Sequence, residues 1–264
     1  MKAIGKAVTF QERKEEDETF MLPFGPLIYY YKMPKKLVAS LNTYADNISK
    51  NAIKSKSLDH SNQLVGKVKQ EFLIEDKELK KHMPIFNRLV GKFIETDLSR
   101  HGQQLPSDIV ITTNYRTAWI VRQFAGEFNP AHVHTECQMS CVGYLKLPSS
   151  IEKEWEEDYK DHHPCKGHIE FLHGQGTHLS KNTALIKPSV GDFFLFPAEL
   201  IHMVYPFESK GERRSFSMNI EISQRKKLSS LDKDSPFQYF HKGDIKAKEV
   251  GTKTKIFKKD EHNV

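Results

Sequence analysis

The chain has too few cysteines to build a disulfide framework. Its 264 residues include only Cys137, Cys141 and Cys165, and an odd number in a chain of this length indicates reduced thiols. We therefore expect a cytoplasmic protein. A zinc site that combines these thiols with His162 and His163 is disfavoured, because the spacing is irregular and Cys141 falls inside a predicted strand.

Long apolar segments are also lacking. No run approaches the roughly 20 apolar residues that a membrane-spanning helix needs. The first residues lead into the charged run 11–18, where a secretory signal would have its apolar core. We therefore expect no membrane span and no export, and the 38% hydrophobic and 28% charged residues suit a globular protein.

The positive charge is unevenly distributed along the chain. The net charge is +6, and residues 225–264 contribute +5 of it, with 11 Lys/Arg against 6 Asp/Glu. The rest of the chain is therefore nearly neutral. A lysine-rich end of this kind is typical of a solvated, flexible tail, and a nucleic-acid arm is the weaker interpretation.

Residue patterns divide the chain into four parts. These are a flexible lead (1–20), a strand with supporting helices (21–108), a β core (109–224) and the basic tail (225–264). Turn-forming residues alternate with aromatic residues in 21–31, which favours a strand at a sheet edge. Apolar residues recur at helical spacing after Pro34, and again from Pro84 to Arg100, which predicts two helices.

The core reads as β structure throughout. From Ile109 to about Ile222 the apolar residues follow a period of two or form short runs bounded by Gly, Pro and Asn. We expect a mainly β fold with a helical buttress, arranged as a sandwich or barrel. Segment 151–163 is expected to be an exposed loop. The predicted strands are 109–113, 117–124, 131–134, 139–147, 167–172, 180–186, 192–197, 203–205 and 213–222.

Three histidines are candidates for a metal site. His132 and His134 are two residues apart in a predicted strand, so their side chains point to the same face and can converge on one ion. His202 follows just after the strand that Pro197 ends, where a ligand at the mouth of a barrel would lie. Most other histidines are better explained as ordinary polar residues.

The last predicted strand has a polar face and an apolar face. If the polar face lines a cavity, Arg213 and Ser215 form a fork-shaped site for a carboxylate. Burying an unpaired guanidinium costs several kcal/mol, so such a site implies an anionic ligand. Arg214, on the opposite face, is expected to point to solvent.

These pieces together resemble the iron(II)/2-oxoglutarate oxygenases, and within them a prolyl-hydroxylase-like group of bacteria and phages with an H-x-H first metal motif. The match spans residues 119–221, with a looser segment at 24–29. It implies a double-stranded β-helix core of the jelly-roll or cupin type. The landmarks are HVH at 132–134, SCVGYL at 140–145, GHIEF at 167–171, PSVGD at 188–192, FP at 196–197, His202 and ERRSFSMN at 212–219.

The resemblance also implies roles for individual residues. His132 and His202 would bind iron(II). Arg213 would pair with the distal carboxylate of 2-oxoglutarate, and Ser215 would share it. Tyr144 is a further candidate donor to this cosubstrate. The cofactors implied are Fe(II), 2-oxoglutarate and O₂, with ascorbate as an additional candidate.

The first metal motif departs from the family's usual His-x-Asp or His-x-Glu. In one interpretation His132, His134 and His202 form a three-histidine site, and the dianionic cosubstrate balances the charge. In the other, the frame shifts by two, so that Glu136 replaces His132 and joins His134 and His202. We favour the first, because the shift leaves a cramped turn before the next strand.

The resemblance implies a dioxygenase that hydroxylates a C–H bond while 2-oxoglutarate is decarboxylated to succinate. A peptidyl side chain is the first substrate hypothesis, and a small molecule is also favoured. A nucleic-acid-modifying oxygenase is the alternative that the basic tail weakly favours. A non-catalytic cupin-like module for metal binding or protein interaction is the alternative from another class, and the unusual His134 is its support.

Overall fold

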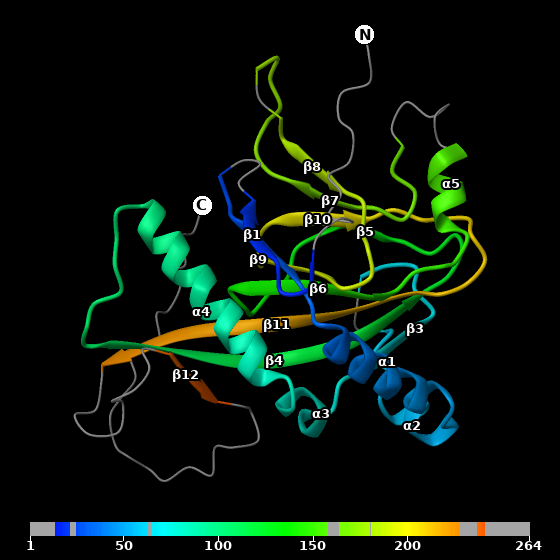
Figure 1. Cartoon of the computed structure of the whole chain (residues 1–264), viewed down its shortest axis with the longest axis horizontal. Coiled ribbons are helices and arrows are strands. Elements are labelled where there is room, and N and C mark those ends of the chain that lie inside the picture. The colour runs from blue at the N-terminus through cyan, green and yellow to red at the C-terminus, as the bar shows by residue number, and fades with distance from the viewer. Residues whose placement is uncertain are drawn as a thin grey trace, which may run out of the picture.

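The protein folds into two sheets with helices against the larger one. The computed structural model describes residues 14–21, 25–62, 65–157, 164–179, 181–226 and 237–240, and Figure 1 shows their arrangement. The predicted lead before residue 14 and most of the predicted basic tail therefore lie outside the described residues, as do His162 and His163. Among the described helices, none is long and apolar enough to cross a membrane.

The larger sheet contains most of the strands. They are β1 (Glu18–Met21), β2 (Ile28–Lys32), β3 (Gln70–Leu73), β4 (Ile109–Gln123), β6 (Met139–Lys146), β9 (Asp192–Pro197), β11 (Arg213–Lys226) and β12 (Phe237–Phe240). Their order is β1-β2-β9-β6-β11-β4-β12, and β3 pairs with another part of β4. The strands pair antiparallel except for β12, which runs parallel to β4.

The smaller sheet faces the first and completes the double-stranded β-helix. Its strands are β5 (Asn129–His132), β7 (Ile169–Leu172), β8 (Thr183–Ile186) and β10 (Ile201–Val204), in the order β5-β10-β7-β8. The apolar core between the two sheets includes Tyr30, Val142, Phe171 and Phe194. The predicted fold class, mainly β with a helical buttress, is confirmed.

Helices cover the outer face of the larger sheet. They are α1 (Lys35–Ser49), α2 (Ala52–Ser57), α3 (Asp76–Lys80) and α4 (Met83–Arg100), whereas α5 (Ile151–Glu157) lies apart from them and contacts the segment before β7 through Trp155. Both predicted helices are present, with Pro34 just before α1 and Pro84 in the first turn of α4. Their apolar stripes pack on Phe216, Met218 and Ile220 of β11. Period-two alternation therefore sends the polar face of β11 inward, away from the helices.

Several predicted boundaries were wrong for identifiable reasons. The predicted strands 109–113 and 117–124 form one strand. Arg116 is an extra residue that forms a bulge in the pairing with β11, and the strand continues on both sides of it. The predicted edge strand lies between β1 and β9 as β2, so that β1 is the edge. The predicted loop 151–163 begins with the helix α5, and its second half lies outside the described residues.

The tail and the segment between the two main helices hold elements that the pattern did not predict. Strand β11 continues to Lys226, and β12 adds residues of the predicted tail to the sheet. Between α1 and α4 the chain forms α2, β3 and α3. These elements are too short to show a clear period in the sequence.

Arg214 is buried, and the expectation that it faces solvent was wrong. It is 2% exposed, and its Nε and Nη2 donate to the two carboxylate oxygens of Glu212 at 2.8 and 2.9 Å. Nη2 also donates to Asp46 of α1 at 2.7 Å, and Arg122 donates to Glu212 at 2.6 Å. This network ties α1 to the sheet through ions that the protein itself neutralises.

We expect Glu212→Gln to lower the free energy of unfolding by roughly 3–5 kcal/mol at neutral pH, because the buried guanidinium of Arg214 and the half-buried one of Arg122 lose their shared carboxylate. Burial opposes ionisation, but the hydrogen bonds and charges of Arg122 and Arg214 lower the pKa of Glu212 to about 2. An ordinary glutamate has a pKa of about 4.3. The contribution is therefore full above that value and is lost as the pH falls toward about 2.

Thermal unfolding of both proteins between pH 7 and pH 2 checks this expectation. The difference in Tm should be largest at neutral pH and should shrink in acid. Glu208→Gln is the matched control, because Glu208 pairs with Lys166 at the surface with its side chain 79% exposed, and it should leave Tm unchanged. A Glu212→Gln difference that stays constant down to pH 2 would contradict the assignment.

Candidate metal and cosubstrate site

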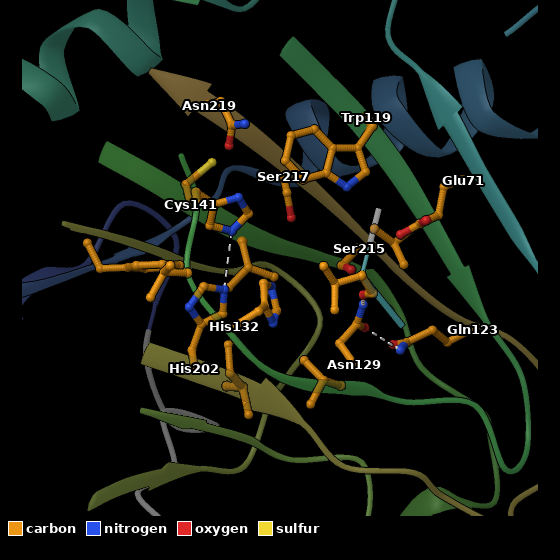
Figure 2. A pocket seen from close by; sticks show the side chains of 18 of the residues that line it. Glu71, Trp119, Gln123, Asn129, His132, Cys141, His202, Ser215, Ser217 and Asn219 are labelled. Carbon is orange, nitrogen blue, oxygen red and sulfur yellow. Dashed lines mark hydrogen bonds between the residues drawn. The ribbon is translucent and has the colours of Figure 1, made fainter. Parts of the chain in front are cut away.

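A cavity of about 220 Å³ lies between the two sheets. The smaller sheet and the chain that follows β5 contribute His132, His134 and His202, and β11 contributes Arg213 and Ser215. Figure 2 shows the polar side chains converging on this space from both walls. The structure thus brings most of the predicted site residues to one cavity.

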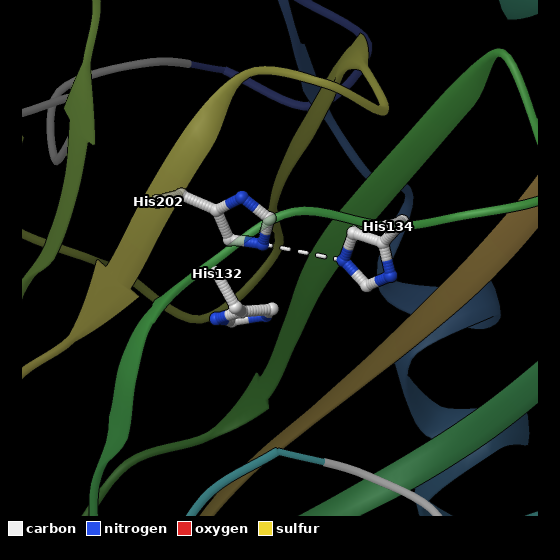
Figure 3. A group of neighbouring side chains, drawn as sticks. All are labelled: His132, His134 and His202. Atoms are coloured by element: carbon white, nitrogen blue, oxygen red, sulfur yellow. Dashed lines mark hydrogen bonds between the residues drawn. The ribbon is translucent and has the colours of Figure 1, made fainter. Parts of the chain in front are cut away.

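The three histidines form a compact cluster. One nitrogen from each of His132, His134 and His202 lies within 4.8 Å of the others, as Figure 3 shows. His132 and His202 are directly paired across β5 and β10. His202 therefore lies within a strand, whereas the prediction placed it before one. His134 lies just beyond the end of β5, so its convergence comes from the loop as well as from strand alternation.

Hydrogen bonds set the orientation of two imidazoles. His132 Nδ1 lies 2.7 Å from the carbonyl of Pro130, and His202 Nδ1 lies 2.9 Å from the carbonyl of Leu200. A carbonyl only accepts, so each Nδ1 carries the proton and each Nε2 keeps a lone pair. This is the usual arrangement of a metal-binding histidine.

Electrostatics keep these imidazoles neutral. Burial, followed by the influence of His132, lowers the pKa of His134 to about 4. Burial and both neighbouring histidines lower the pKa of His202 to about 3, and burial lowers the pKa of His132. The Nε2 atoms of His134 and His202 are 3.3 Å apart. Neutral imidazoles at this spacing suit a first-row divalent metal such as iron(II).

Glu136 is not brought to this cluster. It is exposed, its φ of 59° is left-handed, and its carbonyl accepts from Arg116 at 3.2 Å. The left-handed residue turns the chain toward β6. The geometry therefore favours the interpretation with His132, His134 and His202 as ligands.

Arg213 is almost completely buried on the opposite part of the cavity wall. It is 1% exposed, and its Nε and Nη1 have no hydrogen-bond partner among the described residues. Its Nη2 donates to the hydroxyl of Tyr144 at 3.1 Å, and its guanidinium lies 5.1 Å from the centre of that ring. Ser215 lines the cavity two residues further along β11. Tyr144 thus contacts the arginine, and the unpartnered nitrogens fit an anionic group.

Other residues of the cavity wall were not predicted as site residues. Glu71 and Gln123 are each 2% exposed on the cavity wall, and Asn129 accepts from Gln123 at 2.8 Å. Trp119, which had no assigned role, also lines the cavity. Strand β3, which carries Glu71, has no sequence signal of its own, so only the pairing with β4 could reveal this residue.

The residues from β4 to β11 carry a recognisable family pattern. Residues 117–219 match the model of the family described as "Putative 2OG-Fe(II) oxygenase". The resemblance to the iron(II)/2-oxoglutarate oxygenases is confirmed. The match covers less than half of the chain, and it includes the three clustered histidines together with Arg213 and Ser215.

Comparison with solved structures found similar oxygenase folds, while comparison with curated proteins found no match. A prolyl-4-hydroxylase of Pseudomonas putida has 14% identity and a TM-score of 0.47, covering 74% of this chain and 91% of that chain. A prolyl hydroxylase of Trichoplax adhaerens, in complex with a peptide fragment of the hypoxia inducible factor oxygen degradation domain, has 10% identity and a TM-score of 0.44, covering 78% and 84%. These identities are too low to transfer a substrate.

Substitution of the candidate ligands distinguishes the two ligand frames. We expect His132→Ala to weaken binding of iron(II), or of its redox-stable substitute cobalt(II), by at least about 100-fold, because one of the three candidate ligands is lost. Glu136→Ala is the matched control and should leave the affinity unchanged. Anaerobic titration followed by the cobalt(II) visible spectrum measures both variants. The reverse result would transfer the role to Glu136.

Proposed function

We propose that the protein is an iron(II)- and 2-oxoglutarate-dependent dioxygenase that hydroxylates a C–H bond, with a peptidyl side chain as the substrate. The observation that supports this most directly is the buried Arg213, whose Nε and Nη1 have no partner among the described residues. A module that only bound metal would have no use for this cation. Burying an unpaired guanidinium is costly, so a ligand must provide the anion.

His132, His134 and His202 would hold the metal as three neutral nitrogen ligands. Iron(II), when bound with 2-oxoglutarate and O₂, supplies the oxidising chemistry that couples decarboxylation to hydroxylation. The carbonyls of Pro130 and Leu200 keep the rings of His132 and His202 in the tautomer that leaves Nε2 free. Their low pKa values mean that protons do not compete for these nitrogens at neutral pH.

Arg213 and Ser215 would hold the far carboxylate of 2-oxoglutarate. Residues 213 and 215 point to the same face of β11, and both line the cavity. A guanidinium and a hydroxyl on one face can bind a carboxylate through several hydrogen bonds. Tyr144 positions the guanidinium through its hydroxyl and through a cation–π contact with its ring, and the prediction that it also donates to the cosubstrate stays a prediction.

The mouth of the cavity provides a surface for a substrate chain. Val65 and Val133 line the cavity, and they are 52% and 43% exposed. Exposed apolar residues at a polar cavity are typical of a binding surface. This rim and the prolyl-hydroxylase-like sequence pattern together support a peptidyl side chain as the substrate class.

We expect Arg213→Met to weaken 2-oxoglutarate binding by about 100-fold, or about 2.7 kcal/mol, because the distal carboxylate loses its only buried cation among the described residues of the wall. The affinity for the metal alone should stay unchanged. Anaerobic titration of 2-oxoglutarate into the iron(II) protein, followed by the visible charge-transfer band, measures this affinity. Succinate release on admission of O₂ then measures turnover.

Arg116→Met is the control, because Arg116 has a side chain that is 38% exposed and pairs with Glu221 outside the cavity. It should bind 2-oxoglutarate like the wild type. If the wild-type protein develops no band and releases no succinate, the dioxygenase proposal is wrong. An Arg213→Met variant that keeps full affinity would contradict the role of this arginine.

A further inference from the structure

Glu71 is a buried acid on the cavity wall that the proposed function does not use. It is 2% exposed and lies in β3, where its register partner is Val121 of β4. Val121 is paired in turn with Ser215 of β11. Cross-strand partners point to the same face of a sheet, so Glu71 shares the inner face with the cosubstrate residues, as Figure 2 shows.

The surroundings of Glu71 are acidic and provide no counter-ion. Among the described residues, no side chain forms an ion pair or a hydrogen bond with its carboxyl group. Burial, followed by the nearby acids Asp59 and Glu127, raises the pKa of Glu71 to about 8. An isolated buried carboxyl is costly unless a ligand compensates for it.

The amide side chains of Gln123 and Asn129 already form hydrogen bonds with protein groups. Gln123 Nε2 donates to Asn129 Oδ1 at 2.8 Å, and Asn129 Nδ2 donates to the carbonyl of Val65 at 2.6 Å. Gly66 packs closely against the side chain of Asn129, because a Cβ at position 66 would lie 2.6 Å from Asn129 Nδ2. The amides thus build the wall beside Glu71, and its carboxyl group remains for a ligand.

We propose that Glu71 is a specificity-determining residue that binds a cationic group of the substrate, an alkylammonium or guanidinium as in lysine or arginine. This inference rests on the proposed function, because it places the substrate in the cavity that holds the cosubstrate. The proposed function assigns Arg213 to the carboxylate of the cosubstrate, so the two charges of the cavity wall address different ligands. A bound cation favours the ionised carboxylate and offsets its burial.

Binding of defined probes tests this role without turnover. The protein is loaded with manganese(II) and N-oxalylglycine, an unreactive analogue of 2-oxoglutarate, and titrated by calorimetry. The probes are N-acetyl-lysine methylamide with its norleucine counterpart, and N-acetyl-arginine methylamide with its citrulline counterpart. Free lysine and free arginine show whether the source is an amino acid or a peptide.

The wild-type protein should bind at least one basic probe, capped or free, ten-fold or more tightly than its uncharged counterpart. Glu71→Gln should reduce this preference to two-fold or less, and Glu71→Leu should reverse it in favour of norleucine. Glu208→Gln is the matched control, because Glu208 pairs with Lys166 at the surface and does not line the cavity. It should keep the full preference.

Each other outcome has a defined meaning. A wild-type protein that binds manganese(II) and N-oxalylglycine but shows no preference for basic probes overturns the role of Glu71 and leaves the proposed function standing. A Glu71→Gln variant that keeps the preference for basic probes also overturns this role, because the preference would then not depend on a carboxylate at position 71. Failure of the wild type to bind the metal and analogue counts against the proposed function itself.

Discussion

The site depends on one constraint, which is that a buried guanidinium needs an anionic partner. Two neighbouring arginines on β11 meet this constraint in different ways. Arg213 and Arg214 are both buried and point to opposite faces of one strand. The protein neutralises Arg214 with Glu212 and Asp46, whereas Nε and Nη1 of Arg213 have no partner among the described residues. Either cation would be costly to bury alone. Arg214 therefore serves the fold, and Arg213 implies a ligand.

The position of β11 makes this arrangement rigid. The strand is paired on one side with β4 and on the other with β6, and the helices pack on Phe216 and Met218 from outside. A one-residue slip would turn those apolar side chains into the cavity and expose the site residues to the helices. The apolar packing of the buttress therefore fixes the direction of Arg213 and Ser215.

Much of this arrangement could be predicted from the sequence, because period-two alternation separates the two faces of a strand. Alternation cannot decide which buried ion has a partner, so the sequence did not reveal that Asp46, distant in the chain, covers Arg214. It also could not place His202 inside a strand, since that assignment depends on pairing with His132. Glu71 escaped prediction for the same reason, because β3 is defined by its partner.

Charge balance links the metal to the cosubstrate. In the proposed site three neutral imidazoles bring no negative charge to a divalent cation, and Glu136 lies on the surface. The dianion of 2-oxoglutarate would then compensate both the metal and Arg213 at once. Each of the two positive groups favours the dianion, and the dianion favours the metal in return, because a coupling between two binding events is reciprocal. With a carboxylate ligand this dependence would be weaker, since the metal would already be partly neutralised. In the proposed site, the replacement of the usual acid by His134 would thus make metal retention more sensitive to the presence of the cosubstrate.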